Sequence, residues 1–258
     1  MKDLFIKIGC STERMISTFG SLTIMTFKSF IAIRKAPNYI NQIIEQFIYI
    51  GRESLPIVLL TSTFIGLAMG VQIGIQMTGF TPHWMAGGLV LRTMLIDIGP
   101  VMLGLILAGR VSAGIAAELG TMKVTEQIDA LRSFAIDPIE YLITPRLIAA
   151  MFAVPTLLVF ANLVGVLAGY FSTYLSIDLS WAAFVKGMRY FFYIKDVETS
   201  IIKSFLFGIV IVIFGAFYGL NSLRGAKGVG KATTLAVVWA SVVILILDYL
   251  VSAVLFFL

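Results

Sequence analysis

The chain has 258 residues, of which 59% are hydrophobic and 13% charged, and its mean hydropathy is +0.98. Soluble domains are about 45–50% apolar and about 25% charged, so the composition excludes an ordinary soluble protein, and it excludes a disordered one as well. The apolar runs are long and continuous rather than short and alternating, which argues against an outer-membrane barrel. We therefore predict an all-α, polytopic membrane protein.

The few metal-binding residue types limit the chemistry. Cys10 is the only cysteine and His83 the only histidine, so an intrachain disulfide and a Cys/His zinc site are both excluded. We expect no metal, no cofactor and no catalytic residue in this chain. The net charge of +5 is attributed to basic cytoplasmic loops rather than to nucleic-acid binding.

Residues 1–50 form an N-terminal region of their own in this prediction. Apolar and charged residues between Asp3 and Phe19 are spaced as in a helix that lies in the headgroup plane. We expect that interfacial helix to be followed by a bent segment. The alternative is a sixth span from Met15 to Ile33, which would place Lys28 inside the membrane.

Residues 51–258 form the transmembrane domain. A helix needs about 20 apolar residues to cross a bilayer, and five segments meet that requirement. They are Leu55–Met77, Gly87–Ala108, Leu147–Leu175, Ile202–Leu220 and Thr234–Leu258.

Basic residues predict the orientation of these spans. Lys and Arg gather in the N-terminal region, after the second span and after the fourth span, and such residues favour the cytoplasmic side. The N-terminus is therefore expected in the cytoplasm and the C-terminus outside. Lys203 is assigned to the outer side, as is a short helix expected between Asp178 and Ser200, near aromatic residues typical of the interface.

A glycine-rich loop resembles a phosphate-binding motif. Gly225 to Lys231 fits G-x-x-x-x-G-K, but Ala232 stands where Ser or Thr would hold magnesium, and a membrane span replaces the preceding strand. We interpret it as a flexible basic loop without ATP-binding capacity.

Three glycines recur every four residues on the first span: Gly66, Gly70 and Gly74. Small residues on one face let helix backbones approach closely. Helix packing is the favoured interpretation, and a dimer interface or a sliding surface remains open.

Polar residues inside the spans are candidates for a substrate cavity. Gln72 and Gln76 are i,i+4 neighbours beside Met69 and Ile73. Together with Asp97 on the second span, they suggest a lining suited to an amphiphile. No filter sequence for a cation channel is visible.

Two acidic residues lie within spans, where an ionisable group is costly and indicates function. Asp97 precedes Gly99–Pro100, which is expected to kink the helix. Asp248 lies in the last span, and a functional role and a satisfied interhelical contact are equally plausible for it.

The loop after the second span predicts a helix over about residues 120–136. Gly120 and Thr121 provide a turn and an N-cap, and Asp137–Pro138 ends the helix. Apolar residues share one face at helical spacing: Val124, Ile128, Leu131 and Ala135. This amphipathic helix could rest on the membrane or grip a cytoplasmic partner.

The same region resembles the signature of the MlaE/YrbE permease family, membrane subunits of lipid ABC transporters. GRVSAGIAAELGTMKVTEQIDALRSFAIDPIEYLITPR (109–146) contains the family core E-x-G-x-M-x-x-T-E-Q. FIGLAMGVQ (64–72), DIGPVMLGLILAGR (97–110) and GVGKATTLAVV (228–238) followed by Asp248 stand in the expected order.

This resemblance implies a homodimer in the bacterial inner membrane, with an elbow helix, five spans per chain and a coupling helix that docks on an ATPase subunit. ATP and Mg would bind that partner. Periplasmic MCE-domain subunits and, in some systems, a STAS-domain protein complete the assembly. Residue by residue, the resemblance assigns ATPase coupling to Glu118, Gly120, Thr121, Met122, Thr125, Glu126, Gln127, Ile128, Asp129 and Leu131.

The resemblance also implies a lipid pocket at the dimer centre, lined by Met69, Gln72, Ile73, Gln76 and Asp97. Many relatives read Arg-Glu where this chain reads Ile96-Asp97, so no arginine at that position can grip a lipid phosphate.

The sequence thus predicts a non-enzymatic permease subunit that moves phospholipids with energy from a partner ATPase. The first alternative is a stand-alone secondary transporter or channel for an amphiphile. A membrane-embedded lipid enzyme, with Asp97 and Asp248 paired, is the second and is disfavoured by the absence of a nucleophile motif.

Overall fold

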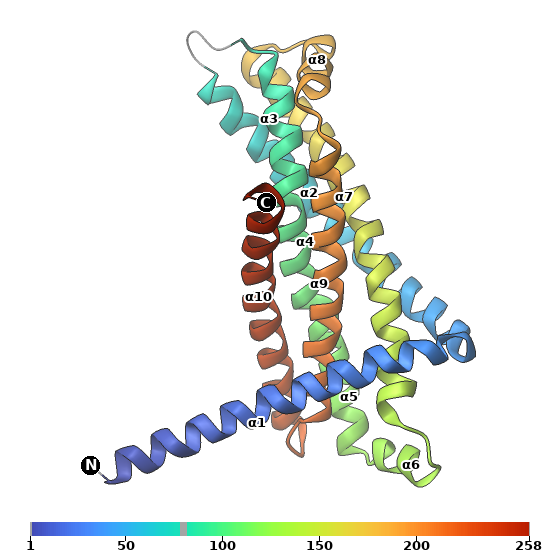
Figure 1. The fold of residues 1–258 in the computed structure, drawn as a ribbon. Helices are drawn as coiled ribbons and strands as arrows, with labels where there is room; N and C mark the ends of the chain where they lie inside the picture. Colours follow the sequence, from blue (N-terminus) through green and yellow to red (C-terminus); the bar gives the residue numbers. More distant parts are fainter. Residues whose placement is uncertain (1, 78–81, 258) are drawn as a thin grey trace.

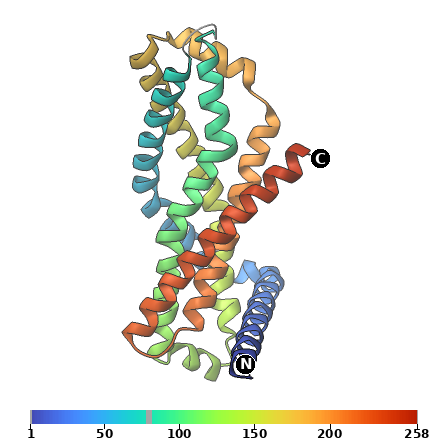
Figure 2. The ribbon, with the colours of Figure 1, turned by 90° about the vertical axis from the view of Figure 1, so that its left-hand side faces the viewer.

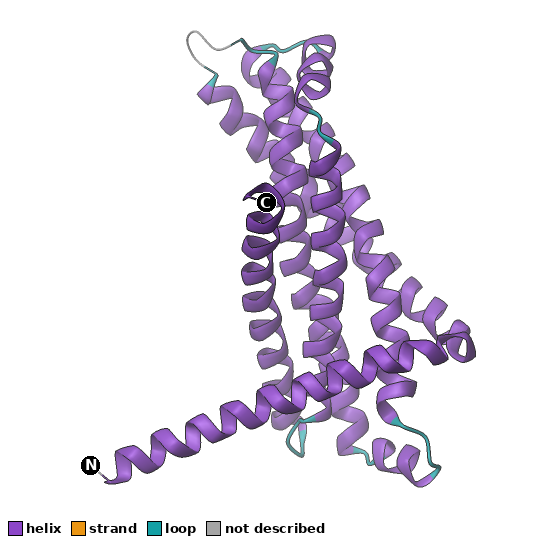
Figure 3. Ribbon diagram, in the orientation of Figure 1, coloured by secondary structure: helices purple, strands orange, loops and turns teal. Residues whose placement is uncertain are grey.

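Residues 2–77 and 82–257 are described in a computed structural model, with side chains described for residues 13, 16–77 and 82–255. Within these ranges every regular element is a helix (Figure 3). Five helical stretches there are long and apolar enough to cross a membrane. The predicted class, an all-α polytopic membrane protein, is confirmed.

The N-terminal helix α1 (Lys2–Ala32) lies across the foot of the bundle rather than along it (Figures 1 and 2). It runs past residue 19, where we expected the chain to bend. The bend comes instead at the 3-10 turn Ile33–Tyr39, which contains Pro37, the first proline of the chain. Most side chains of the amphipathic face predicted on residues 3–19 lie outside the described ones.

The bend after α1 is tied to a later part of the chain. Lys35 Nζ lies 2.7 Å from Glu140 Oε2, and the Tyr39 hydroxyl donates to Glu140 Oε1 at 3.2 Å. Helix α2 (Ile40–Gln76) then begins ten residues before the domain boundary expected at residue 50 and continues through it and through Pro56. The N-terminal region and the first span are therefore joined by one helix.

The second membrane helix is a chain of helical segments without a break between Met85 and Val124. It comprises α3 (Met85–Thr93), a π turn (Met94–Ile98), α4 (Gly99–Leu107), a second π turn (Ala108–Ser112) and α5 (Ala113–Val124). We expected a kink at Gly99–Pro100, and the structure has the first π turn directly before these two residues, which begin α4. The helix continues well past Ala108, the predicted end of the span.

The helix predicted over residues 120–136 is wrong in its start and its length. Gly120 and Thr121 lie inside α5, where the Thr121 hydroxyl donates a hydrogen bond to Ala117 O of the same helix. The backbone breaks instead at Glu126, whose φ of 60° is left-handed, and α6 (Gln127–Ser133) spans only seven residues. Helical periodicity continued through the loop, so the pattern could not reveal this break.

The remaining helices complete the bundle. A π turn (Ile139–Ile143) leads into α7 (Thr144–Ile177), followed by α8 (Trp181–Phe191), α9 (Ile194–Leu220) and α10 (Ala226–Phe257). The short helix expected between residues 178 and 200 is α8, which lies at the opposite end of the bundle from α6 (Figure 1).

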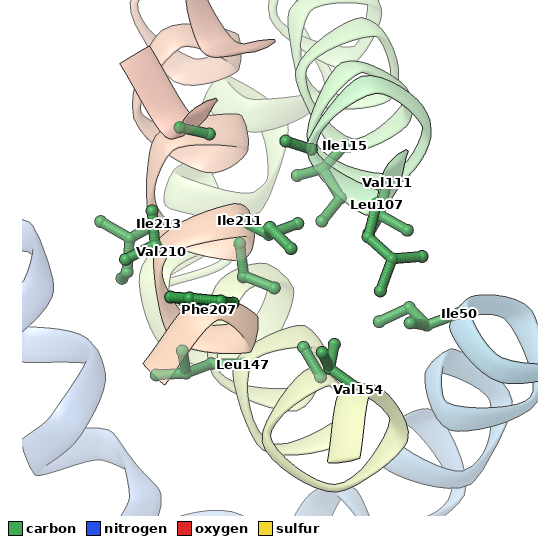
Figure 4. Close-up of a cluster of buried hydrophobic side chains, with 14 of the residues drawn as sticks. Ile50, Leu107, Val111, Ile115, Leu147, Val154, Phe207, Val210, Ile211 and Ile213 are labelled. Atoms are coloured by element: carbon green, nitrogen blue, oxygen red, sulfur yellow. The ribbon is translucent and has the colours of Figure 1, made fainter. Parts of the chain in front are cut away.

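The apolar core lies where α2, α4, α5, α7 and α9 meet (Figure 4). Phe207 and Ile211 of α9 are fully buried and face side chains from the long second helix and from α7. Figure 4 labels further members of this cluster: Ile50, Leu107, Val111, Ile115, Leu147 and Val154. Since lipid tails are as apolar as these side chains, close packing rather than water exclusion holds them together.

The most extensive helix contact among the described residues joins α2 to α7. A Cβ built on Gly66 would stand 2.0 Å from Gly165 O, and one on Gly70 would stand 2.4 Å from Gly169 O. Gly74 faces Ser176 in the same row. We call this row the glycine seam. It is filled by α7 of the same chain, so this face is not open to a second subunit.

We predict that Gly66→Ala lowers the thermal stability of the detergent-solubilised protein. The added methyl has no room against Gly165, and overpacking of this kind costs about 1–3 kcal/mol. Gly51→Ala on the same helix is the control, because nothing lies within 4 Å of its Cβ position. Equal melting temperatures for the two variants would contradict the tight contact.

Candidate functional site

A buried lysine links three of the membrane helices. Lys203 of α9 has a fully buried side chain. Its Nζ lies 2.6 Å from Asp248 Oδ1 of α10 and 3.9 Å from Asp97 Oδ1 of the first π turn. We call these three residues the charge cluster. A lone charge at membrane depth is costly, so the paired carboxylates are what allow the lysine to stay there.

The backbone near Asp97 supplies a further partner. In a regular helix the residue-100 amide would donate to the Ile96 carbonyl, but Pro100 has no N–H. Lys203 Nζ donates to Ile96 O at 2.6 Å. Pro100 therefore leaves the Ile96 carbonyl without its helical donor, and Lys203 donates the hydrogen bond instead.

The charge cluster differs from the sequence prediction in its key member. We assigned Lys203 to the outer side, at the beginning of a span starting at Ile202, whereas α9 begins at Ile194 and carries the lysine inward. The available signal was Asp97 and Asp248, two acidic residues within spans that need a cation nearby. Asp97 is 62% exposed, so the cluster opens to the surface of the single chain on one side.

The residues predicted to line a lipid cavity lie on two faces of α2. Gln72 and Gln76 are exposed. Ile73 is buried with Met77, and Met69 packs against the same apolar cluster. Met69 and Ile73 thus face the protein interior, while Gln72 and Gln76 face outward. Asp97 meets Lys203 rather than any of these four side chains in the described contacts.

The predicted ATPase-coupling residues divide into inner and outer groups. Glu118 Oε1 lies 2.6 Å from Arg146 Nη2, and Arg146, which is 4% exposed, also donates to Leu142 O at 2.8 Å. Glu118 therefore ties α5 to α7. Gly120 is buried beside Val229 and Ser222, and the Met122 side chain packs against the core.

The outer group lies on residues 125–138, which we call the α6 loop. Ile128 is buried and Leu131 half-buried, so these two side chains hold the loop to the bundle. Four further predicted coupling residues are exposed on this loop: Thr125, Glu126, Gln127 and Asp129. Thr121 is exposed on α5, and the Glu118 side chain is 52% exposed despite its ion pair.

Phe134 in the α6 loop is an exposed aromatic side chain that the motif did not single out. It is 77% exposed, the highest value among the large hydrophobic residues described. It directly follows α6, which lies at the opposite end of the bundle from α8 (Figure 1). Its side chain is therefore accessible to a group outside this chain.

The opposite end of the bundle is closed by aromatic and ionic contacts. The ring centroids of Trp84 and Tyr190 are 5.3 Å apart. Arg92 Nε lies 2.9 Å from Asp196 Oδ2, and the Arg92 guanidinium lies over the Tyr193 ring. These contacts fit the aromatic interface predicted there.

The acidic residues form no metal site within the described part of the chain, where no group of three or more His, Cys, Asp or Glu side chains could hold an ion. The site is therefore composed of a charge cluster inside the bundle, a row of exposed glutamines and an α6 loop at one end.

Comparison with known proteins places this arrangement in a family context. The family model described as Permease MlaE matches residues 43–254. A probable ABC transporter permease protein of Rickettsia conorii is 38% identical, over 96% of both chains. The chloroplastic protein TRIGALACTOSYLDIACYLGLYCEROL 1 of Arabidopsis thaliana is 35% identical, over 90% of this chain and 67% of its own length. The intermembrane phospholipid transport system permease protein MlaE of Haemophilus influenzae is 29% identical, over 96% of both chains.

We predict that Lys203→Met destabilises the protein by about 3 kcal/mol, because it leaves Asp248 and the Ile96 carbonyl without their cation. Thermal unfolding in detergent measures the effect. Lys195→Met, on an exposed site of the same helix, is the control. The double variant Lys203→Met with Asp248→Asn should be more stable than Lys203→Met alone, and the charge cluster would lose its assigned role if it were not.

Proposed function

Since the chain belongs to the MlaE family of permeases, we propose that it is the permease subunit of a phospholipid ABC transporter driven by ATP hydrolysis on a separate chain. Its five apolar helical stretches and its family membership indicate a multi-pass protein of the inner membrane. The proposal adds the partner ATPase, which holds ATP and Mg, and transfer of lipid between the inner membrane and the periplasmic side. The α6 loop is the observation that supports it most.

The α6 loop has the properties of a docking element. It combines exposed polar side chains with the exposed Phe134, and Ile128 and Leu131 anchor it to the bundle. Because the loop is packed against the bundle, a displacement of the loop also displaces the helices behind it, whereas an unattached loop would move alone. Glu126 is exposed and lies between the end of α5 at Val124 and the start of α6 at Gln127.

The helix behind this loop offers a route for motion into the membrane. The segment from Met85 to Val124 is helical throughout, so a displacement at α5 reaches the π turn that carries Asp97. The ion pair between Glu118 and Arg146 joins that segment to α7. A nucleotide-dependent push on the loop favours one arrangement of the helices over another, as coupling requires.

The lipid path in this proposal runs along the outward face of α2 and the open side of the charge cluster. Gln72, Gln76 and Asp97 are exposed in the single chain. A second copy of the chain placed over them would enclose a cavity between the two subunits. Met69 and Ile73 support this wall from behind rather than line it.

The proposed assembly follows from the same family. Two copies of the chain, two ATPase subunits and external MCE-domain subunits would form the transporter, and a STAS-domain protein would bind the ATPase in some systems. The α6 end would face the cytoplasm, with the N-terminus there and the C-terminus on the periplasmic side.

We predict that Glu126→Lys lowers ATP-driven lipid transfer at least about tenfold, because a reversed charge in a docking surface opposes the partner. Lysine accepts the left-handed backbone at this position as poorly as glutamate does, so the fold should be kept. Co-purification of the ATPase and transfer of fluorescent phospholipid are the two readouts. Glu198→Lys, exposed near the other end of the bundle, is the matched control.

Full recovery of the ATPase with Glu126→Lys would remove the docking role from the α6 loop. Loss of the ATPase with Glu198→Lys as well would attribute the effect to overall charge instead.

We also predict that liposomes holding this chain alone transfer no phospholipid, and that transfer appears only when the ATPase and ATP are added. The reason is that the permease has no source of energy of its own in this proposal. Lipid or ion flux driven by an ion gradient in liposomes with this chain alone would instead favour a stand-alone secondary transporter.

A further inference from the structure

A polar hollow lies at the α6 end of the bundle, where α1 crosses the ends of α9 and α10 (Figure 1). Its volume is about 370 Å³. One wall is α1, with Ser17, Thr18 and Ser21, and the other is formed by Ser222, Gly228 and Lys231. The hollow is separate from the charge cluster and from the exposed face of α2.

One wall of the hollow holds a buried hydroxyl without a partner. Ser222 is 5% exposed, and its Oγ makes no hydrogen bond within the part of the chain that the structure describes. A buried polar group left unpaired costs about 1–3 kcal/mol. The Ser222 Oγ lies beside Gly120 of α5 and is closed to solvent, so a ligand with hydrogen-bonding oxygens in the hollow satisfies it once the side chain turns toward the hollow.

The surroundings of the hollow are strongly positive. Arg224, Lys227 and Lys231 lie within eight residues, and the sequence holds no acidic residue from Thr199 to Leu247. None of these three cations takes part in an ion pair found among the described residues. Lys231 lines the hollow itself, so the potential there favours an anion.

The backbone adds to this preference. Gly225 has a φ of 86°, and the glycine-rich turn leads directly into the N-terminus of α10, a helix of 32 residues. The amides of a helix N-terminus carry partial positive charge and bind phosphate groups. Ala232 still rules out the hydroxyl that a magnesium nucleotide would need, so the motif suits a phosphate group without a metal.

We propose that this hollow binds one phosphate group, that of a phospholipid headgroup, between α1 and the start of α10. Lys231 forms the ion pair with the phosphate, and the hydroxyls of Ser222 and Ser17 donate hydrogen bonds to it, whereas the Ser21 hydroxyl already donates to Thr18 O. The bound headgroup fixes α1 to the bundle at the point where the helix leaves it. Free phosphate offers the same chemistry, and the experiment separates the two sources.

The test counts lipids bound to the purified full-length protein by native mass spectrometry, with dioctanoyl phosphatidylglycerol as the probe. Dioctanoylglycerol, which lacks the phosphate, is the chemical control, and inorganic phosphate is added in a separate arm. Lys231→Gln should weaken one phosphatidylglycerol site per chain about tenfold. Ser222→Ala should weaken the same site several-fold.

Lys227→Gln is the matched control, since it removes the same charge from the first turns of the same helix without lining the hollow. It should bind phosphatidylglycerol as the parent protein does. Equal losses for Lys227→Gln and Lys231→Gln would overturn the proposal, as would equal binding of dioctanoylglycerol at this site. If inorganic phosphate bound in a Lys231-dependent way while phosphatidylglycerol did not bind at this site, the lipid headgroup would be ruled out as the source of the phosphate group. The hollow would then be a site for free phosphate.

Discussion

The charge cluster is the interaction on which the bundle most depends. Lys203 is fully buried at membrane depth, and its charge is offset by Asp248, by Asp97 and by the Ile96 carbonyl that Pro100 leaves without a donor. These groups come from α9, from α10 and from the π turn of the second membrane helix. A buried cation in an apolar medium needs all of its partners close by, so the cluster sets the relative positions of three helices. Because Asp97 also faces outward, the same residues lie at the border between the packed interior and a polar surface.

The long second membrane helix connects this cluster to the α6 loop. Two π turns, Met94–Ile98 and Ala108–Ser112, interrupt its regular hydrogen bonding without ending it. Such turns often occur at functional sites. Glu118, near the end of the helix, holds the buried Arg146 of α7. The helix therefore forms ion pairs at two positions along its length, Asp97 and Glu118. Under the proposed function, a movement of its α5 end is carried along the continuous helix to the charge cluster.

The α2–α7 contact has a different physical basis, and it leaves other faces free. In the glycine seam the backbones themselves touch, which is the main source of helix association where lipid and side chains are equally apolar. This contact fixes α2 against its own chain, so that Gln72 and Gln76 face outward. The exposed face of α2 and the polar hollow at α1 are on separate parts of the molecule, which allows lipid transfer and headgroup binding to be separate properties.

Composition, segment length and motif were enough to predict the membrane class, the five apolar stretches and the family. Composition and segment length are properties of the chain whatever its fold. Proline chemistry is less decisive, because Pro100 follows a π turn whereas α2 continues through Pro56. The folded chain was needed to show that Lys203 is buried, that Glu118 pairs with Arg146, and that Ile73 faces inward while Gln72 faces outward. It also placed the helix break at Glu126, inside a stretch whose apolar spacing continues unbroken. Each of these depends on which side chains from distant helices come within a few ångströms of one another, and spacing along a single chain carries no information about that.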